Sequence, residues 1–343
     1  MNRLITNNKF YNMKEEDAIE EKLCITESEP PLNITSNENS CNNISNYSEW
    51  IESDNQTFFP TTKLVIHQKL PSGLYDIDYS HSKESYYFKR KGLVLDELLN
   101  LPDPTFKLIL DDMQYFWNNE QKFNDYNFAY KRGILLYGPP GNGKTSLTAL
   151  LSDYLINKMG GIVFSVKTSR DLEHYSQAIP DYFKVIEKNT PILTLIEDLD
   201  GLLAFKENET MLLNILDGFK QINNAVYVGC TNYPEQLKDR ILNRPSRFDK
   251  RYYIGNPLAD VRKYYLEHKI KNNDLKRYSI DDIVKKTEGL SLAHLGELIK
   301  SVYIFGKELE ESIEELRNMS DFLSSSKFEK SSKPTGFLNG KQS

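Results

Sequence analysis

The chain has 343 residues and a formal net charge of −6, a length that suggests about two domains. Residues 1–60 carry eleven acidic and four basic side chains, so the rest of the chain has a net charge of +1 and lacks the basic excess that favours nucleic acid. Its three cysteines lack metal-ligand spacing, and no apolar run is long enough to span a bilayer, so the sequence predicts a protein of a reducing compartment, in the cytoplasm or the soluble interior of a host cell, with no membrane span.

The N-terminal part of the chain changes composition twice. Residues 1–58 are rich in Asn, Ser and Glu with scattered apolar residues, which is typical of a disordered segment. Residues 59–103 contain strand-like runs separated by turn residues, and these predict a small β-rich module. From Pro104 to Phe123 apolar residues recur at helical spacing, which predicts a helix leading into the next domain.

A glycine-rich loop follows a short apolar run and precedes a helical pattern. The loop reads Gly138-Pro139-Pro140-Gly141-Asn142-Gly143-Lys144-Thr145. Two glycines with four residues between them, followed by Lys and a hydroxyl residue, fit the pattern that cradles phosphates. Because the N-terminus of a helix presents unpaired N–H groups to an anion, we expect this loop to bind a nucleoside triphosphate.

Strand and helix patterns alternate around and after this loop. Residues 104–256 are therefore predicted to form a doubly wound α/β domain, a parallel sheet with helices on both faces. Its predicted strands are 133–137, 161–166, 192–196, 225–229 and 251–255, and its predicted helices after the loop include 182–188 and 209–219. Residues 257–319 show only helical periodicity and are expected to form a small α-helical lid domain, and residues 320–343 a flexible tail.

Two strands of this domain end in polar residues. The run 191–200 places Glu197 and Asp198 after an apolar strand, where one carboxylate can help to hold magnesium and the other can orient the attacking water. The alternative for this run is an exposed acidic turn. The next strand ends in Thr231-Asn232, whose amide could contact the γ-phosphate or the water, or could simply cap the strand.

The glycine loop, the acidic strand, Thr231-Asn232, the run Arg244-Pro245-Ser246-Arg247-Phe248-Asp249 and the helical end, in this order and spacing, resemble the AAA family of ATPases. The resemblance covers residues 100–310. The segment from Leu70 to Arg132 is similar to a branch found in phages, bacteria and large viruses, which is related to the mitochondrial Rieske-protein translocase (Bcs-type) ATPases.

The resemblance implies a role for each matching residue. Lys144 would contact the β- and γ-phosphates, and Thr145 would bind magnesium together with Glu197 and Asp198. Asn232 matches the first sensor residue. Arg244 and Arg247 match arginine fingers that act on a neighbouring subunit, which implies a homo-oligomer, usually a hexamer. The nucleotide-binding residues would be Gly138, Pro139, Pro140, Gly141, Asn142, Gly143, Lys144, Thr145 and Ser146.

The sequence departs from the family pattern in three places. The lid motif Gly289-Leu290-Ser291-Leu292-Ala293-His294-Leu295 aligns with a family segment near adenine but has no arginine there. The usual acidic order is Asp then Glu, whereas here Glu197 precedes Asp198, so which of the two activates water stays open. The region from Ser169 to Ser176 lacks the aromatic–apolar–Gly triplet of protein-threading members, and Tyr175 is either a substrate grip or a packing residue.

Other residues near the expected base site have competing interpretations. Tyr126 and Asn127 are weak candidates for the edge of an adenine pocket, in a stretch whose aromatic residues are better explained by packing. His294 is better explained as a surface or helix-start residue than as a ligand. His268 is a weak candidate for contact with ribose or adenine.

These observations predict a magnesium-dependent ATP hydrolase that works as an oligomeric ring and remodels or moves macromolecular substrates, with proteins favoured. One alternative is a nucleic-acid-associated ATPase, such as a loader or packaging accessory, which the neutral body of the chain does not support. Another is a low-turnover scaffold gated by nucleotide, for which the order of Glu197 and Asp198 is the only indication.

Overall fold

The structure is a computed structural model that describes residues 49–54, 57–61, 67–81, 84–93, 99, 101–185, 187, 190–217, 221–244, 246–271, 274 and 277–323. The chain divides into two compact units, Met1–Gln68 and Lys69–Ser343. Most of the predicted disordered segment and the tail beyond residue 323 lie outside the described residues. No helix in the part of the chain described here has the length and apolar character needed to cross a membrane.

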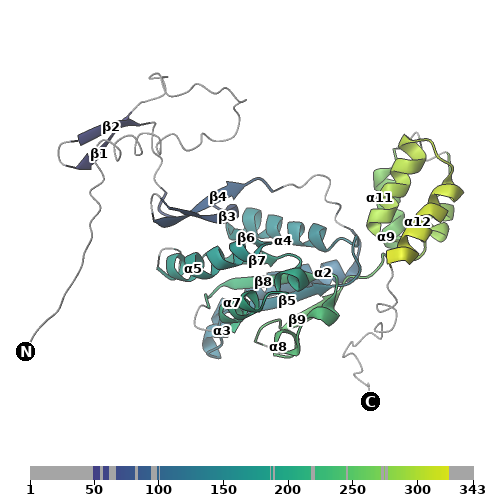
Figure 1. Ribbon diagram of the computed structural model, residues 1–343. Helices are drawn as coiled ribbons and strands as arrows, with labels where there is room; N and C mark the ends of the chain where they lie inside the picture. The colour runs from purple at the N-terminus through teal and green to yellow at the C-terminus, as the bar shows by residue number, and fades with distance from the viewer. Residues whose placement is uncertain are drawn as a thin grey trace, which may run out of the picture. The chain divides into compact units, whose positions relative to one another are not determined.

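The first unit contains a two-stranded antiparallel hairpin. Strand β1 (Glu49–Asp54) pairs with β2 (Thr57–Thr61), and Ile51 faces Phe59 in the register (Figure 1). Strand β1 and the start of β2 lie within residues 1–58, the segment whose composition is typical of disorder. Trp, Ile and Phe favour strands, so the local composition of the hairpin differs from that of the residues before it.

The second unit is built on a seven-stranded sheet, which confirms the predicted α/β class with a mostly parallel sheet. The strand order is β4-β3-β6-β7-β8-β5-β9, and only β4 runs antiparallel to its neighbour. The strands are β3 (Gly73–Ser80), β4 (Ser85–Lys91), β5 (Lys131–Tyr137), β6 (Ile162–Val166), β7 (Ile192–Ile196), β8 (Ala225–Thr231) and β9 (Lys250–Tyr253).

Strands β3 and β4 belong to this sheet, whereas the sequence placed them in a separate β-rich module. Strand β3 pairs in parallel with β6, with Tyr75 beside Phe164 in the register. Tyr75 is buried in the same core cluster as Phe164, and its hydroxyl donates to the carbonyl of Pro71 at 2.6 Å. The pairing joins residues far apart in the sequence, which local strand signals do not reveal.

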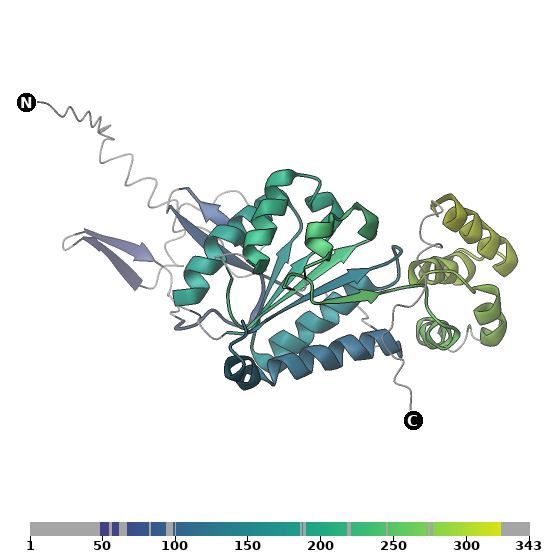
Figure 2. The ribbon, with the colours of Figure 1, turned by 90° about the horizontal axis from the view of Figure 1, so that it is seen from below.

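Helices cover both faces of the sheet (Figure 2). Two buried clusters result. One packs helices such as α5 and α7 against the sheet, and the other packs α2 and α4. Among the described residues before 257, the α-helices are α2 (Pro104–Trp117), α3 (Glu120–Asp125), α4 (Lys144–Met159), α5 (Ser169–Val185), α6 (Leu199–Leu202), α7 (Lys206–Asp217) and α8 (Asp239–Leu242).

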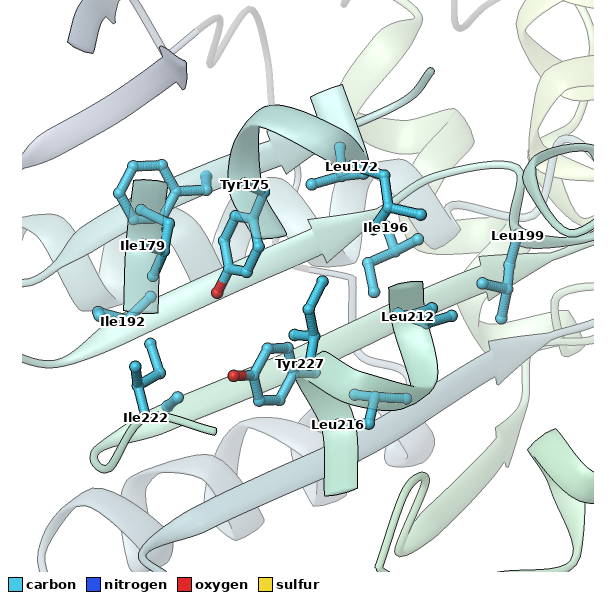
Figure 3. Packing of buried hydrophobic residues seen from close by; sticks show 14 of the residues in the cluster. Leu172, Tyr175, Ile179, Ile192, Ile196, Leu199, Leu212, Leu216, Ile222 and Tyr227 are labelled. Carbon is cyan, nitrogen blue, oxygen red and sulfur yellow. The ribbon is translucent and has the colours of Figure 1, made fainter. Parts of the chain in front are cut away.

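Helix α5 begins thirteen residues before the predicted helix 182–188. Its start is capped because the Asp171 carboxylate accepts hydrogen bonds from the backbone N–H groups of Lys167 and Thr168, at 3.0 and 2.9 Å. Tyr175 faces the core from this helix (Figure 3), and its hydroxyl accepts a hydrogen bond from Thr194 Oγ1 at 2.8 Å. Of its two interpretations, packing is therefore the one that the structure supports.

After residue 257 the described chain is helical. It forms α9 (Ala259–Lys269), α10 (Ile280–Lys286), α11 (Leu292–Ile299), a π-helical stretch (Lys300–Ile304) and α12 (Leu309–Leu323). These helices share a buried apolar cluster that includes Leu266, Ile283, Leu298 and Leu316. Helix α12 continues past the predicted end at residue 319.

Candidate nucleotide site

The glycine loop connects β5 to α4, as the sequence predicts. Gly138, Gly141 and Gly143 all have positive φ angles, of 144°, 78° and 88°. A Cβ atom on Gly138 would lie 2.3 Å from the carbonyl oxygen of Ile254, the residue after β9. The backbone therefore takes a path that side chains at these positions would obstruct.

The loop carries hydrogen-bond donors that have no acceptor among the described residues. Within the described residues, the backbone N–H groups of residues 141–146 donate no hydrogen bond. The Lys144 ammonium donates to the loop's own carbonyls, at 2.7 Å to Gly138 and 2.9 Å to Pro139. Burial lowers the pKa of Lys144 to about 8. A ring of amides around a partly desolvated lysine suits a polyanion such as a triphosphate.

The two carboxylates directly follow β7. Glu197 Oε2 lies 3.1 Å from Lys167 Nζ. Asp198 has a left-handed backbone with φ 49° and precedes α6, and its side chain makes no capping hydrogen bond there. Beside them Asp200 accepts a hydrogen bond from the Thr231 hydroxyl, which ties the start of α6 to the end of β8. Glu197 is thus partly neutralised, whereas Asp198 has no such cation beside it in the described structure.

Asn232 follows β8 at the same edge of the sheet, where the parallel strands β7 and β8 end. Its Oδ1 atom is buried and has no hydrogen-bond partner among the described residues. Cys230, two residues earlier, is also buried, and burial raises the pKa of its thiol to about 12. An unsatisfied buried acceptor is costly in a folded protein, so Asn232 is suited to a bound water or ligand.

One cavity of about 540 Å³ brings these parts together. Its walls include Lys144, Thr145, Glu197, Asp198 and Asn232. The lining residues are Leu99, Leu101, Pro140, Gly141, Gly143, Lys144, Thr145, Ser146, Glu197, Asp198, Cys230, Thr231, Asn232, Tyr265, Lys269, Leu292 and Ala293. Among the expected nucleotide-binding residues, Gly138, Pro139 and Asn142 lie outside this lining.

Some residues that line the cavity were not predicted from the sequence. Tyr265 and Lys269 line the cavity from α9, and Leu99 and Leu101 line it from the chain before α2. The i, i+4 spacing of Tyr265 and Lys269 places them on one face of a helix and was the available signal. Leu99 and Leu101 carry no comparable signal.

The C-terminal helices contact the glycine loop directly. The backbone N–H of Ala293, in α11, donates to the carbonyl of Gly141 at 3.0 Å. The Asn142 side-chain amide donates to Asn256 Oδ1 at 2.9 Å, and Asn256 donates to the carbonyl of Gly289 at 2.7 Å. The loop is thus hydrogen-bonded directly to the start of α11 and, through Asn256, to the residues just before that helix.

The residues present fit a magnesium ion. Mg²⁺ prefers oxygen ligands and takes most of them from phosphates and water, so one hydroxyl and one or two carboxylates are sufficient on the protein side. Thr145, Glu197 and Asp198 supply these oxygens around the same cavity. No group of three or more His, Cys, Asp or Glu side chains that could hold a metal ion occurs among the described residues.

The two candidate arginine fingers differ in their surroundings, and neither lines the cavity. The Arg244 side chain is 67% exposed and lies 3.8 Å from Asp217 Oδ2. Arg247 is 6% exposed, and its Nε donates to Asp217 Oδ2 at 2.8 Å. Its guanidinium also donates to the carbonyl of Arg240. Arg247 is therefore held inside its own subunit in this structure.

The weaker candidates from the sequence do not line the cavity. Tyr126 is 75% exposed, and Asn127 beside it is also exposed. His268 packs against the ring of Tyr264, and its Nδ1 lies 2.8 Å from that residue's carbonyl. His294 forms a capping box with Ser291 at the start of α11, in agreement with the helix-start interpretation.

Comparison with known proteins agrees with this geometry. The sequence model of the ATPase family associated with various cellular activities (AAA) matches residues 134–256. The "ATP-dependent zinc metalloprotease FtsH 2" of Thermoanaerobacter sp. (strain X514) is 29% identical over 264 residues, which are 69% of this chain and 48% of the relative.

Two mitochondrial relatives are also similar. The "Probable mitochondrial chaperone bcs1" of Schizosaccharomyces pombe is 34% identical over 154 residues, covering 44% of this chain and 34% of the relative. The "Mitochondrial inner membrane i-AAA protease supercomplex subunit YME1" of Saccharomyces cerevisiae is 30% identical over 211 residues, which cover 57% of this chain and 27% of the relative. The chain thus spans less than half the length of these three relatives.

Proposed function

The chain carries an AAA ATPase domain, and on that premise we propose that the protein binds ATP with a magnesium ion and hydrolyses it in an oligomeric ring. The observation that supports this most is the single cavity that joins the glycine loop, both strand-end carboxylates and Asn232. Phosphoryl transfer depends mainly on positioning and on stabilisation of charge, and this cavity holds groups suited to both.

The phosphate contacts come from the loop and Lys144. In binding a triphosphate, Lys144 exchanges its hydrogen bonds to the carbonyls of Gly138 and Pro139 for bonds to the β- and γ-phosphates. The backbone N–H groups of residues 141–145 hold the remaining oxygens, and Pro139 and Pro140, which cannot donate, stiffen the loop. The magnesium ion, when bound, neutralises charge on the phosphates. Thr145 and Glu197 are the residues that would hold it.

Water activation is assigned to Asp198 with Asn232. Glu197 faces Lys167, whereas Asp198 is free of such a cation and lines the same wall as Asn232. Asp198 accepts the proton of the attacking water, and the unpartnered Oδ1 of Asn232 orients that water.

The remaining positive charge is supplied in trans by Arg244. Its side chain is exposed and is absent from the lining of its own cavity, as an arginine that serves a neighbouring subunit requires. A finger of this kind can contribute on the order of 10³–10⁵ in rate. We place it in a homo-hexamer, with helices α9–α12 acting as a lid over the nucleotide.

Protein substrates are favoured because the relatives are named as proteases and a chaperone. Stimulation of ATP hydrolysis by an unfolded model protein, and not by single-stranded DNA, would support this class. The reverse result would support the nucleic-acid alternative.

Asp198→Asn tests the hydrolytic assignment. The variant is expected to bind ATP normally and to lose hydrolysis by about 10²–10⁴-fold, the usual contribution of a general base. Asp181→Asn, at an exposed position of α5, is the matched control and should retain wild-type turnover. Normal turnover by Asp198→Asn would contradict the assignment, and parallel measurement of Glu197→Gln would show whether the other carboxylate activates water.

Turnover per subunit tests the assembly. It is expected to rise with protein concentration for the wild type and to be lost in Arg244→Ala, while ATP binding persists. Turnover that is independent of concentration and insensitive to Arg244→Ala would exclude the ring mechanism, and negligible wild-type turnover at every concentration would support the scaffold.

A further inference from the structure

Helix α7 carries two adjacent buried polar residues near its start, Asn208 and Glu209, which are 2% and 1% exposed. Neither belongs to the motifs described above. Buried side chains of these types are costly unless they are paired, so their partners indicate what they do.

Asn208 holds the end of the segment that carries Asp198. Its side-chain amide donates to the carbonyl of Leu202, the last residue of α6, at 2.8 Å. It also donates to Ser169 Oγ, at the start of α5, at 2.7 Å. Because α6 begins immediately after Asp198, Asn208 helps to fix the segment that positions this carboxylate.

Glu209 holds the segment that carries the arginines. It pairs with Lys238 Nζ at 2.6 Å and with Arg240 Nε. The hydrogen bond from Arg240, together with the bond from Lys238, holds the pKa of Glu209 at about 2, so the carboxylate stays charged. The Arg240 carbonyl in turn accepts the bond from Arg247.

Both ends of α7 therefore bind one stretch of chain, residues 238–247, which we call the arginine segment. Residue 245 of this segment lies outside the described residues. Glu209 binds the segment near the start of the helix, and Asp217 binds Arg247 at the end of the helix. Arg244 lies between the two anchors and is exposed.

We propose that Glu209 is a positioning residue that sets the placement of Arg244 for the neighbouring subunit, and that α7, through Asn208 and Glu209, couples this placement to the segment after Asp198. The inference rests on the proposed function, in that it requires hydrolysis with an arginine supplied in trans. Glu209 itself touches neither nucleotide nor water.

Glu209→Gln removes the charge that holds Lys238 and Arg240 while it preserves the shape of the side chain. It is expected to lower kcat by on the order of 10²-fold, the cost of a small misplacement of a catalytic group, and to leave ATP binding unchanged. Glu207→Gln, at an exposed position of the same helix, is the matched control and should retain wild-type kcat.

Mixing variants distinguishes a role in trans from a merely structural one. Subunits with Lys144→Ala have a disabled phosphate loop but an intact arginine segment. Subunits with Glu209→Gln have an intact phosphate loop but a misplaced arginine segment. Mixed rings should therefore regain hydrolysis, because a Lys144→Ala subunit can serve the ATP held by a Glu209→Gln subunit. Failure of this mixture to regain hydrolysis, when a mixture of Arg244→Ala with Lys144→Ala does regain it, would overturn the inference.

The arginine mixture also tests the proposed function separately. If Arg244→Ala and Lys144→Ala do not complement each other, the assignment of Arg244 as an arginine supplied to the neighbouring subunit is itself wrong. Should Glu209→Gln fail to fold, Arg240→Gln replaces it, because that side chain is 45% exposed and its loss removes the contact between Glu209 and the residue whose carbonyl binds Arg247. Arg240→Gln is expected to behave in the mixture as Glu209→Gln would, and wild-type kcat for this folded variant would overturn the inference.

Discussion

Asp217 Oδ2 accepts a hydrogen bond from Arg247 Nε at 2.8 Å, and this contact makes Arg247 different from Arg244, which is three residues earlier. The family resemblance implies that both arginines act on a neighbouring subunit. The structure gives Arg247 two partners in its own subunit and leaves Arg244 exposed. We therefore expect the two arginines to differ in what their loss does.

Arg247→Ala should destabilise the fold, because it leaves the carboxylate of Asp217, which is mostly buried, without its close partner. Breaking a buried ion pair typically costs about 3–5 kcal/mol, and partial exposure of Asp217 places the expected loss near the lower end. Arg244→Ala should leave the free energy of unfolding unchanged within the small range of exposed pairs. Unfolding in urea, followed by circular dichroism, measures both. Equal stability of the two variants would refute the distinction.

The pKa of Lys144 predicts the pH dependence of ATP binding. Burial lowers this pKa from 10.5 to about 8, so in the free protein the ammonium is charged below that pH and neutral above it. ATP affinity should fall as the pH rises through about 8. The free energy of unfolding should rise between about 8 and 10.5, because the unfolded chain then binds the extra proton.

Binding of a fluorescent ATP analogue from pH 6.5 to 9.5 measures the effect. Lys144→Arg is the control, because a guanidinium stays charged throughout this range. Any binding that this variant retains should not depend on pH in the same way. An affinity of the wild type that stays constant across the range would contradict the lowered pKa.

The predictions that held depend on local patterns. The glycine loop, β7 and the end of β8 could be located from the sequence because apolar runs and the residues that follow them are contiguous. The pairing of β3 with β6 and the burial of Arg247 against Asp217 join distant segments, and a single sequence contains no local signal for them. The start of α5 could not be located from the sequence because Pro180 lies inside the helix, where a proline usually marks a helix start or a break.

Gly141→Ala is expected to weaken ATP binding through a steric conflict with the C-terminal helices. A Cβ atom at this position would lie 2.8 Å from Ala293 Cβ and 3.0 Å from Ser291 Oγ, and φ is 78°. Overpacking of this kind typically costs about 1–3 kcal/mol, which corresponds to about five- to 150-fold in affinity. Isothermal titration with a non-hydrolysable ATP analogue measures it.

Gly160→Ala is the matched control for this substitution. Gly160 also has a positive φ, of 65°, but a Cβ atom there would meet nothing within 4 Å. It should lower stability through its backbone conformation and leave ATP affinity unchanged. If both variants bind ATP equally well, contact between the loop and α11 does not limit binding.

Asn142 and Asn256 should act as a coupled pair that ties the glycine loop to the C-terminal helices. Asn142 is 3% exposed and donates to Asn256, which donates to the carbonyl of Gly289. A double-mutant cycle of Asn142→Ala and Asn256→Ala, measured on the free energy of unfolding, should give an interaction energy of about 0.5–3 kcal/mol, as for groups in one hydrogen-bond network. The pair Asp153 and Asn157, bonded at 2.6 Å on an exposed face of α4, is the control and should give only a few tenths of a kcal/mol, about 0.2–0.5. Additive effects of Asn142→Ala and Asn256→Ala would show that the bond between them does not hold the loop to these helices, because each substitution would then act through its own surroundings alone.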